Sequence, residues 1–265
     1  MELIAKISKG SRMDQVYIPK NRSSFAIGSY VVLRLIGAEK PAEKPYFYNI
    51  GRIEPIKLEI INWIIGAIDK TTDSYENIII TGSFLNEGFG FNDVDIIIIK
   101  KNAVDEKRIM DTIKDTTGLK AHVIAIDNVT LVEGLSKDPL YQMMLSRCIA
   151  KKRFIYKVKH EIDYKILDLH LLKSKALIDN FDLLSGNDKY YLVRNMIAIF
   201  LFLQRRKIDN ENVDKEIMKI FKLKDIWEIK QNMLDKGAFL KKYRIFYGKT
   251  FNRIMDGIKY GSKQK

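Results

Sequence analysis

The sequence predicts an α/β (α+β) protein in which strands and helices alternate in the first half and helices alone form the second half. The runs Ile78–Ile80 and Ile96–Ile99 have the β-branched composition of buried strands, and a glycine-bearing connection separates them. Beyond Glu133 the spacing of apolar residues is almost wholly helical. A small N-terminal β-hairpin region precedes these two parts.

The N-terminal region, residues 1–45, combines two predicted strands with a linker. The strands are Gln15–Lys20 and Ser29–Ile36, and the proline-bearing segment 37–45 reads as the linker. An apolar strand that ends in Ile-Pro-Lys, followed by glycine and a second strand, resembles the AbrB-type swapped-hairpin DNA-binding module. That resemblance implies DNA binding, and the alternative is an accessory hairpin packed on the next domain.

Residues 46–135 are predicted to form the core domain, and residues 136–265 a basic helical domain. In the core domain, we expect a helix over 56–69 that Pro55 opens, strands over 77–82 and 94–99, a helix over 103–116 and a strand over 119–126. In the second domain, we expect helices over 138–151, 163–181, 187–206, 210–221, 224–236 and 239–260.

The connection between the two isoleucine-rich strands carries the residues from which we predict function. Gly82 and Ser83 close the first strand, and Asp93 and Asp95 stand at the start of the second. Strand alternation places both carboxylates on one face, where they repel each other unless a cation lies between them. Oxygen ligands of this kind suit Mg²⁺ or Mn²⁺. Glycine lets backbone N–H groups approach a phosphate closely.

This motif, Gly82-Ser83 followed by Asn92-Asp93-Val94-Asp95, resembles the signature of the polymerase-β-like nucleotidyltransferase superfamily, in particular its small archaeal and bacterial members. The resemblance covers residues 57–127. It implies a mixed sheet with flanking helices, an NTP held by the Gly-Ser turn, and transfer of its nucleotidyl group. Asp93 and Asp95 would be the metal ligands, and Asn92 occupies the position at which the family usually has serine.

One part of the family pattern is missing, namely a third carboxylate near the start of the next core strand. His122 occupies that position, while Asp127 lies at the far end of the strand and on its other face. Three interpretations stay open: His122 acts as ligand or base, Asp127 substitutes through a shifted register, or the site holds one metal and turns over poorly. His122 as an ordinary hydrogen-bonded strand residue is a fourth.

Composition and charge narrow the expected location and partners. The single cysteine, Cys148, excludes an intrachain disulfide and fits a reducing cytoplasm, and its neighbours predict an amphipathic helix with a buried thiol. No apolar run is long enough for a membrane span. Residues 57–135 carry 8 Lys/Arg and 13 Asp/Glu, whereas residues 136–265 carry 29 and 15. The basic half suggests a polyanionic partner such as RNA or tRNA, or else a solvated lysine-rich surface.

Two residues of the predicted helix over 187–206, Tyr190 and Arg194, share a helix face and are candidates for contact with a nucleotide. Together these observations predict a metal-dependent nucleotidyltransferase that moves NMP from an NTP to an acceptor hydroxyl on RNA, on tRNA or on a protein. Two alternatives are a catalytically weak or inactive nucleotide- or nucleic-acid-binding regulator, and an antitoxin-like enzyme that modifies a partner protein.

Overall fold

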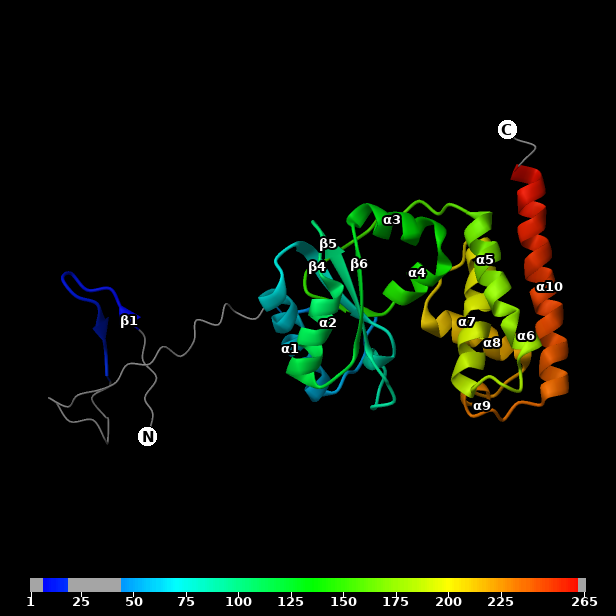
Figure 1. Cartoon of the computed structure of the whole chain (residues 1–265), viewed down its shortest axis with the longest axis horizontal. Coiled ribbons are helices and arrows are strands. Elements are labelled where there is room, and N and C mark those ends of the chain that lie inside the picture. Colours follow the sequence, from blue (N-terminus) through cyan, green and yellow to red (C-terminus); the bar gives the residue numbers. More distant parts are fainter. Residues whose placement is uncertain (1–6, 19–43, 262–265) are drawn as a thin grey trace. The chain divides into compact units, whose positions relative to one another are not determined.

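The computed structural model describes residues 7–18 and 44–261 (Figure 1). The chain divides into two compact units, residues 1–42 and 43–265. In the first unit, strands β1 (Ile7–Ser8) and β2 (Gln15–Val16) pair in antiparallel fashion. The predicted strand that begins at Gln15 is therefore present at its start. The predicted strand over 29–36, and with it the resemblance to a DNA-binding hairpin, lies outside the described residues.

The second unit contains a five-stranded mixed sheet, which confirms the predicted α/β (α+β) class. In spatial order its strands are β3 (Tyr46–Tyr48), β7 (Cys148–Ala150), β4 (Tyr75–Thr81), β5 (Val94–Lys100) and β6 (Ala121–Ile126). β5 and β6 run parallel, and the other neighbouring pairs are antiparallel. The two isoleucine-rich runs are thus the neighbouring strands β4 and β5.

Each side chain of the isoleucine runs is buried because helices cover both faces of the sheet (Figure 1). Even-numbered residues of β4 and β5, such as Ile78 and Ile96, pack against α1 (Pro55–Thr71) and α2 (Glu106–Thr117). Odd-numbered residues pack against α3 (Asn128–Lys137) and α4 (Pro139–Leu145). Full burial of one such side chain contributes roughly 1.5–3 kcal/mol to stability. We call the second face the α3 face.

The predicted helix over 138–151 is wrong in its second half. The helix α4 ends at Leu145, and Cys148–Ala150 forms strand β7 between β3 and β4. A three-residue strand is too short to show a period of two, so the helical pattern that precedes it dominated the prediction. Pairing with Tyr46–Tyr48 and with Ile79–Ile80 determines the strand instead.

The remaining helices form a bundle around α7, whose residues from Val193 to Phe202 are largely buried. The bundle consists of α5 (Tyr164–Ser174), α6 (Ala176–Asp179), α7 (Gly186–Leu203), α8 (Asn210–Phe221), α9 (Trp227–Lys230) and α10 (Lys236–Gly261). Two predicted helices are shorter than expected: the one over 163–181 is interrupted at Lys175, and the one over 224–236 is reduced to α9.

The α3 face of the sheet connects to this bundle through α4. Met143 of α4 belongs to the apolar core of the bundle, whereas Leu145 belongs to the core on the α3 face. At the N-terminus of α4, Asp138 Oδ2 lies 2.9 Å from His170 Nε2 of α5, and both side chains are largely buried. Helix α4 therefore places the bundle beside the face of the sheet that bears Asp95.

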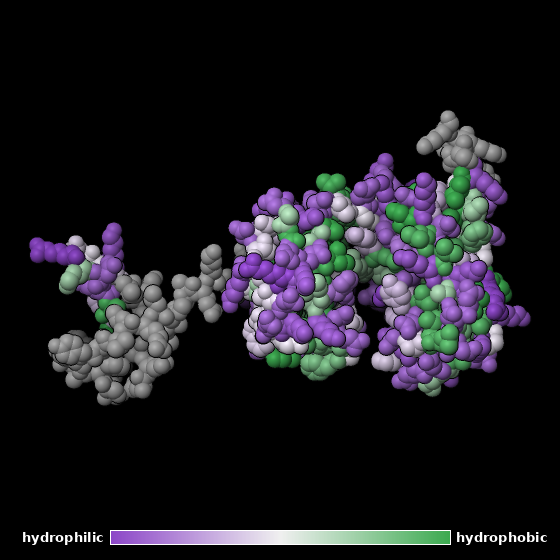
Figure 2. All heavy atoms as spheres, viewed as in Figure 1, coloured by the Kyte–Doolittle hydropathy of each residue, from purple (hydrophilic) through white to green (hydrophobic). Residues whose placement is uncertain are grey.

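The visible surface of residues 44–261 mixes hydrophilic and hydrophobic side chains, and it is indented where the sheet part meets the bundle (Figure 2). Within the described part of the chain, none of the helices combines the length and the apolar character that crossing a membrane requires.

Candidate functional site

The end of β4 and the start of β5 meet at Gly82. Thr81 pairs with Asp95 in the antiparallel ladder, so Gly82 follows directly beside the Asp95 side chain. Gly82 has φ +83°, and a Cβ atom built on it would lie 2.0 Å from Asp95 Oδ2. A side chain here would be strained by the backbone conformation and would collide with the carboxylate. Only glycine leaves the Asp95 carboxylate in place.

Asp93 and Asp95 lie close enough to influence each other electrostatically. Burial raises the pKa of Asp95, and the negative charge of Asp93 raises that pKa further. The imidazole of His122 and the positive charge of Arg194 act in the opposite direction. This mutual repulsion is the property that a bound cation would relieve.

The register of β5 and β6 decides between the candidates for the third position. Asp95 pairs with His122, and His122 Nδ1 lies 3.4 Å from Asp95 Oδ1. The side chain of His122 is 62% exposed, so it is open to a ligand. The structure therefore places His122 beside Asp95, close to the start of its strand.

Asp127 does not reach the site, and the shifted register that would bring it there is wrong. Ile126 pairs with Ile99, so Asp127 lies at the opposite end of β5, about 16 Å along the strand from the level of Asp95. Its carboxylate accepts a hydrogen bond from the backbone N–H of Thr130 and caps α3. That bond lowers the pKa of Asp127, and it gives the residue a structural role.

Two cations hold the loop between Gly82 and Asp93, and the sequence analysis identified neither. Lys57 of α1 is fully buried, and its Nζ donates to the carbonyl oxygens of Asn86 and Gly88. Arg147, just before β7, donates from Nη1 to Asn86 Oδ1 at 2.7 Å and from Nη2 to the Leu85 carbonyl. The motif loop is therefore fixed from both faces of the sheet, by α1 on one side and by the α4–β7 connection on the other.

The loop offers Lys57 an aromatic and acidic environment. Its Nζ lies 5.3–5.8 Å from the ring centroids of Phe84, Phe89 and Phe91, and 3.0 Å from Glu54 Oε2. The backbone N–H of Gly88 donates to the other carboxylate oxygen of Glu54, and this bond, together with Lys57, lowers the pKa of Glu54 to about 2. Three phenylalanines in a glycine-rich polar loop, opposite a helix that carries lysine, are the sequence feature from which this clamp could have been predicted.

The other predicted nucleotide contacts differ in accessibility. Ser83 and Asn92 are exposed at the two ends of the loop. The Tyr190 hydroxyl donates to Asp214 Oδ1 of α8 at 2.7 Å, and burial raises the pKa of Tyr190. Tyr190 is therefore held within the bundle, and its hydroxyl already has a partner.

Arg194, on α7 of the bundle, acts electrostatically on the carboxylate of Asp95. Burial raises the pKa values of Asp95 and Asp214, and the positive charge of Arg194 opposes this rise at both carboxylates. The Arg194 Nε is buried and has no hydrogen-bond partner among the described residues. A guanidinium whose charge acts on Asp95 can pair with a phosphate group that is bound near that carboxylate.

The donor chemistry of the site fits Mg²⁺ or Mn²⁺. Asp93 and Asp95 supply hard oxygen atoms, and Mg²⁺ commonly binds through one or two carboxylates plus substrate phosphates. Among the described residues, no group of three or more His, Cys, Asp or Glu side chains is arranged to hold a metal ion.

Cys148, which the sequence analysis placed in a helix, lies on β7 and is fully buried. Burial raises the pKa of its thiol to about 12, which opposes formation of the nucleophilic thiolate at neutral pH. The expectation of a buried thiol is confirmed, although its secondary structure was predicted wrongly.

Comparison with known proteins adds no family assignment. No protein-family model matches the sequence. No curated protein matches it at a significant level either.

Proposed function

We propose that this protein is a divalent-metal-dependent nucleotidyltransferase that moves NMP from an NTP to an acceptor hydroxyl. The observation that carries the proposal is the close approach of Gly82 to Asp95, with the charges of Asp93 and Arg194 both acting on the Asp95 carboxylate. In the reaction, an acceptor oxygen forms a bond to the α-phosphorus, the bond from that phosphorus to the bridging oxygen breaks, and pyrophosphate leaves.

Each part of the site has a role in this proposal. The turn at Gly82 and Ser83 receives the triphosphate, and exposed Asn92 borders it. Asp93 and Asp95 hold Mg²⁺ or Mn²⁺, which when bound supplies charge neutralisation at the phosphates. Arg194 donates to a phosphate oxygen and offsets the charge that develops during transfer. His122 stands beside Asp95 as an additional ligand or base.

A polyanionic acceptor, RNA or tRNA, is the acceptor class that the charge distribution favours. Residues 136–265 carry 29 Lys/Arg against 15 Asp/Glu, and this is the part of the chain that supplies Arg194. The second candidate function is a nucleotide-binding regulator without turnover. The presence of His122 where the family pattern has a carboxylate is the observation that favours it.

Incubation with labelled NTPs, Mg²⁺ or Mn²⁺, total RNA and cell lysate tests the proposal. Label on RNA supports the RNA acceptor, and label on a protein supports a protein acceptor. Nucleotide binding without any transfer to either would favour the regulator.

The metal preference of the enzyme is expected to depend on His122. A neutral imidazole binds Mg²⁺ poorly and Mn²⁺ better, because nitrogen ligands favour later transition metals. We therefore expect low turnover with Mg²⁺, higher turnover with Mn²⁺, and a gain in Mg²⁺-supported turnover for His122→Asp. Initial rates of the variant and the wild type with each metal measure the effect.

Asp127→Ala is the matched control for the His122 variant, because it removes a carboxylate that directly follows the same strand but lies at a distance from the site. It is expected to lower thermal stability slightly through the lost cap and to leave turnover unchanged. Loss of turnover in Asp127→Ala, together with no response to His122→Asp, would contradict the assignment of the third position.

Arg194→Gln is expected to lower kcat/KM for the NTP by about 10²-fold, because it removes a charged donor to the phosphates. Steady-state kinetics measure this effect. Arg244→Gln, which removes the same charge from an exposed position on α10, is the control and should leave kcat/KM unchanged. If both variants lowered kcat/KM equally, Arg194 would contribute only through the net charge of the protein and not through a contact with the phosphates.

A further inference from the structure

Five side chains of α7 and α9 alternate between aromatic rings and cations, and we call them the aromatic–cation ladder. In order they are Trp227, Lys230, Tyr190, Arg194 and Tyr191. Lys230 Nζ lies 5.2 Å from the ring centroid of Trp227 and 4.5 Å from that of Tyr190. Arg194 Cζ lies 5.9 Å from the centroid of Tyr190 and 5.2 Å from that of Tyr191.

The ladder is fixed at its centre and open at its ends. Tyr190 is anchored by its bond to Asp214. Trp227 is 58% exposed and Tyr191 is 51% exposed, although the bundle beside them has a well-buried apolar core. Two large exposed rings, each with a cation within cation–π distance, form a surface on which planar aromatic groups can stack and phosphates can pair.

We propose that the aromatic–cation ladder binds a single-stranded segment of RNA, with bases stacked on Trp227 and Tyr191 and the backbone paired with Lys230. The excess of positive charge in residues 136–265 supports a polyanionic occupant. Exposed rings favour a single strand, because bases in a duplex are stacked on each other and not available. The link of this surface to catalysis rests on the proposed function. Arg194 belongs to the ladder and its charge also acts on the Asp95 carboxylate, so a strand bound to the ladder would approach the proposed nucleotidyl-transfer site.

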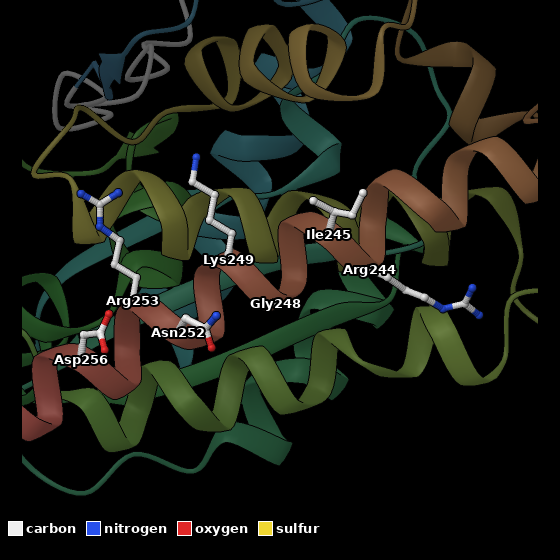
Figure 3. A pocket seen from close by; sticks show the side chains of 7 residues that line it. All are labelled: Arg244, Ile245, Gly248, Lys249, Asn252, Arg253 and Asp256. Carbon is white, nitrogen blue, oxygen red and sulfur yellow. The ribbon is translucent and has the colours of Figure 1, made fainter.

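A second basic surface, along α10, is the competing location for nucleic acid. A shallow hollow of about 620 Å³ there is lined by Arg244, Ile245, Gly248, Lys249, Asn252, Arg253 and Asp256 (Figure 3). Its cations can attract phosphates, but the aromatic ring beneath Lys249 and Arg253 belongs to Phe200, which is only 5% exposed. This surface therefore has no exposed ring among its lining residues for a base to stack on.

Tryptophan fluorescence tests the proposal directly because the chain contains two tryptophans, Trp63 and Trp227. Trp63→Phe leaves Trp227 as the reporter, and Trp227→Phe leaves Trp63 on α1 as the control. Each is titrated, without NTP or metal, with a mixed-sequence single-stranded RNA of about 12 nucleotides, the matched duplex, and inorganic polyphosphate. We expect the single strand to quench Trp227 but not Trp63, and polyphosphate to quench neither.

Affinities of further variants, measured by anisotropy of a labelled single strand, separate the two surfaces. Trp227→Leu and Lys230→Gln are each expected to weaken binding about tenfold, and affinity should fall steeply with salt. Lys249→Gln on α10 should change it little. Thermal melts show whether each variant is folded.

Three results would overturn the proposal. The first is weaker RNA binding in Lys249→Gln but not in Lys230→Gln. The others are quenching of Trp227 by polyphosphate as strong as that by RNA, and tighter binding of the duplex than of the single strand. Since the titrations need no turnover, failure of the proposed function is distinguishable from failure of the ladder. RNA binding without nucleotidyl transfer would leave the ladder as a nucleic-acid site. If NMP were transferred to a protein and RNA did not quench Trp227, the RNA-binding proposal for the ladder would be refuted and the nucleotidyltransferase proposal would stand.

Discussion

Replacing both Asp93 and Asp95 with asparagine is expected to abolish metal-dependent NTP binding while the fold stays intact. The double variant loses the two charged oxygen ligands on which the metal site depends. Isothermal titration calorimetry with NTP in the presence of Mg²⁺ or Mn²⁺ measures the effect. Unchanged affinity would show that the site has been assigned wrongly.

The same variant is expected to be as thermally stable as the wild type or more stable at pH 7. The folded state raises the pKa of Asp95, so it binds that proton more tightly than the unfolded chain does. Stability contributed by this group is therefore lost as the pH rises from the unfolded-state pKa through the raised folded-state pKa. Asparagine removes this loss, so the advantage of the variant should shrink in acid.

A control for net charge is the variant Asp111→Asn with Asp115→Asn. It also removes two carboxylates, from the exposed side of α2. We expect it to retain NTP binding and to show no advantage in melting temperature at pH 7.

Gly82→Ala is expected to lower kcat/KM by at least about 10²-fold, because even a 1 Å displacement of a reacting group has an effect of that size. The added Cβ would lie 2.0 Å from Asp95 Oδ2, so the carboxylate must leave its position. The backbone of Gly82, with φ +83° and ψ −162°, lies in a region that is essentially restricted to glycine, and alanine there adds roughly 1–3 kcal/mol of strain. Kinetics and thermal melts of the same protein sample measure the two effects separately.

Gly118→Ala is the matched control for this prediction. Gly118 has φ +73° at the end of α2, and a Cβ built on it would meet no atom within 4 Å. Gly118→Ala therefore also places alanine at a positive φ but causes no collision, and we expect it to lose stability but keep its activity. If both variants keep their activity, the close approach of Gly82 and Asp95 is not required for function.

The core of the fold was predictable from sequence because its elements have strong local patterns. The isoleucine runs of β4 and β5 have a composition that few other structures favour, and the predicted helix over 210–221 coincides with α8. The family pattern pointed to His122 near the start of the strand that follows β5, and in the structure this residue pairs with Asp95.

The features that sequence analysis missed depend on contacts between distant residues. Strand β7 exists because Cys148–Ala150 fills the space between β3 and β4, and nothing within three residues predicts that pairing. Lys57 is fully buried because the loop over 82–93 folds over it and provides oxygen atoms and aromatic rings. The charge of Arg194 acts on Asp95 only because α4 brings the bundle to the α3 face of the sheet.

The insertion of β7 between β3 and β4 has a consequence for the cooperativity of the protein. A fragment that ended at residue 135 would keep Gly82, Asp93, Asp95 and His122, yet β4 would become an unprotected edge strand that can template aggregation. Residues 136–150 supply α4 to the bundle and β7 to the sheet. Neither part retains its packing when the other is removed, so residues 43–265 should unfold in a single transition.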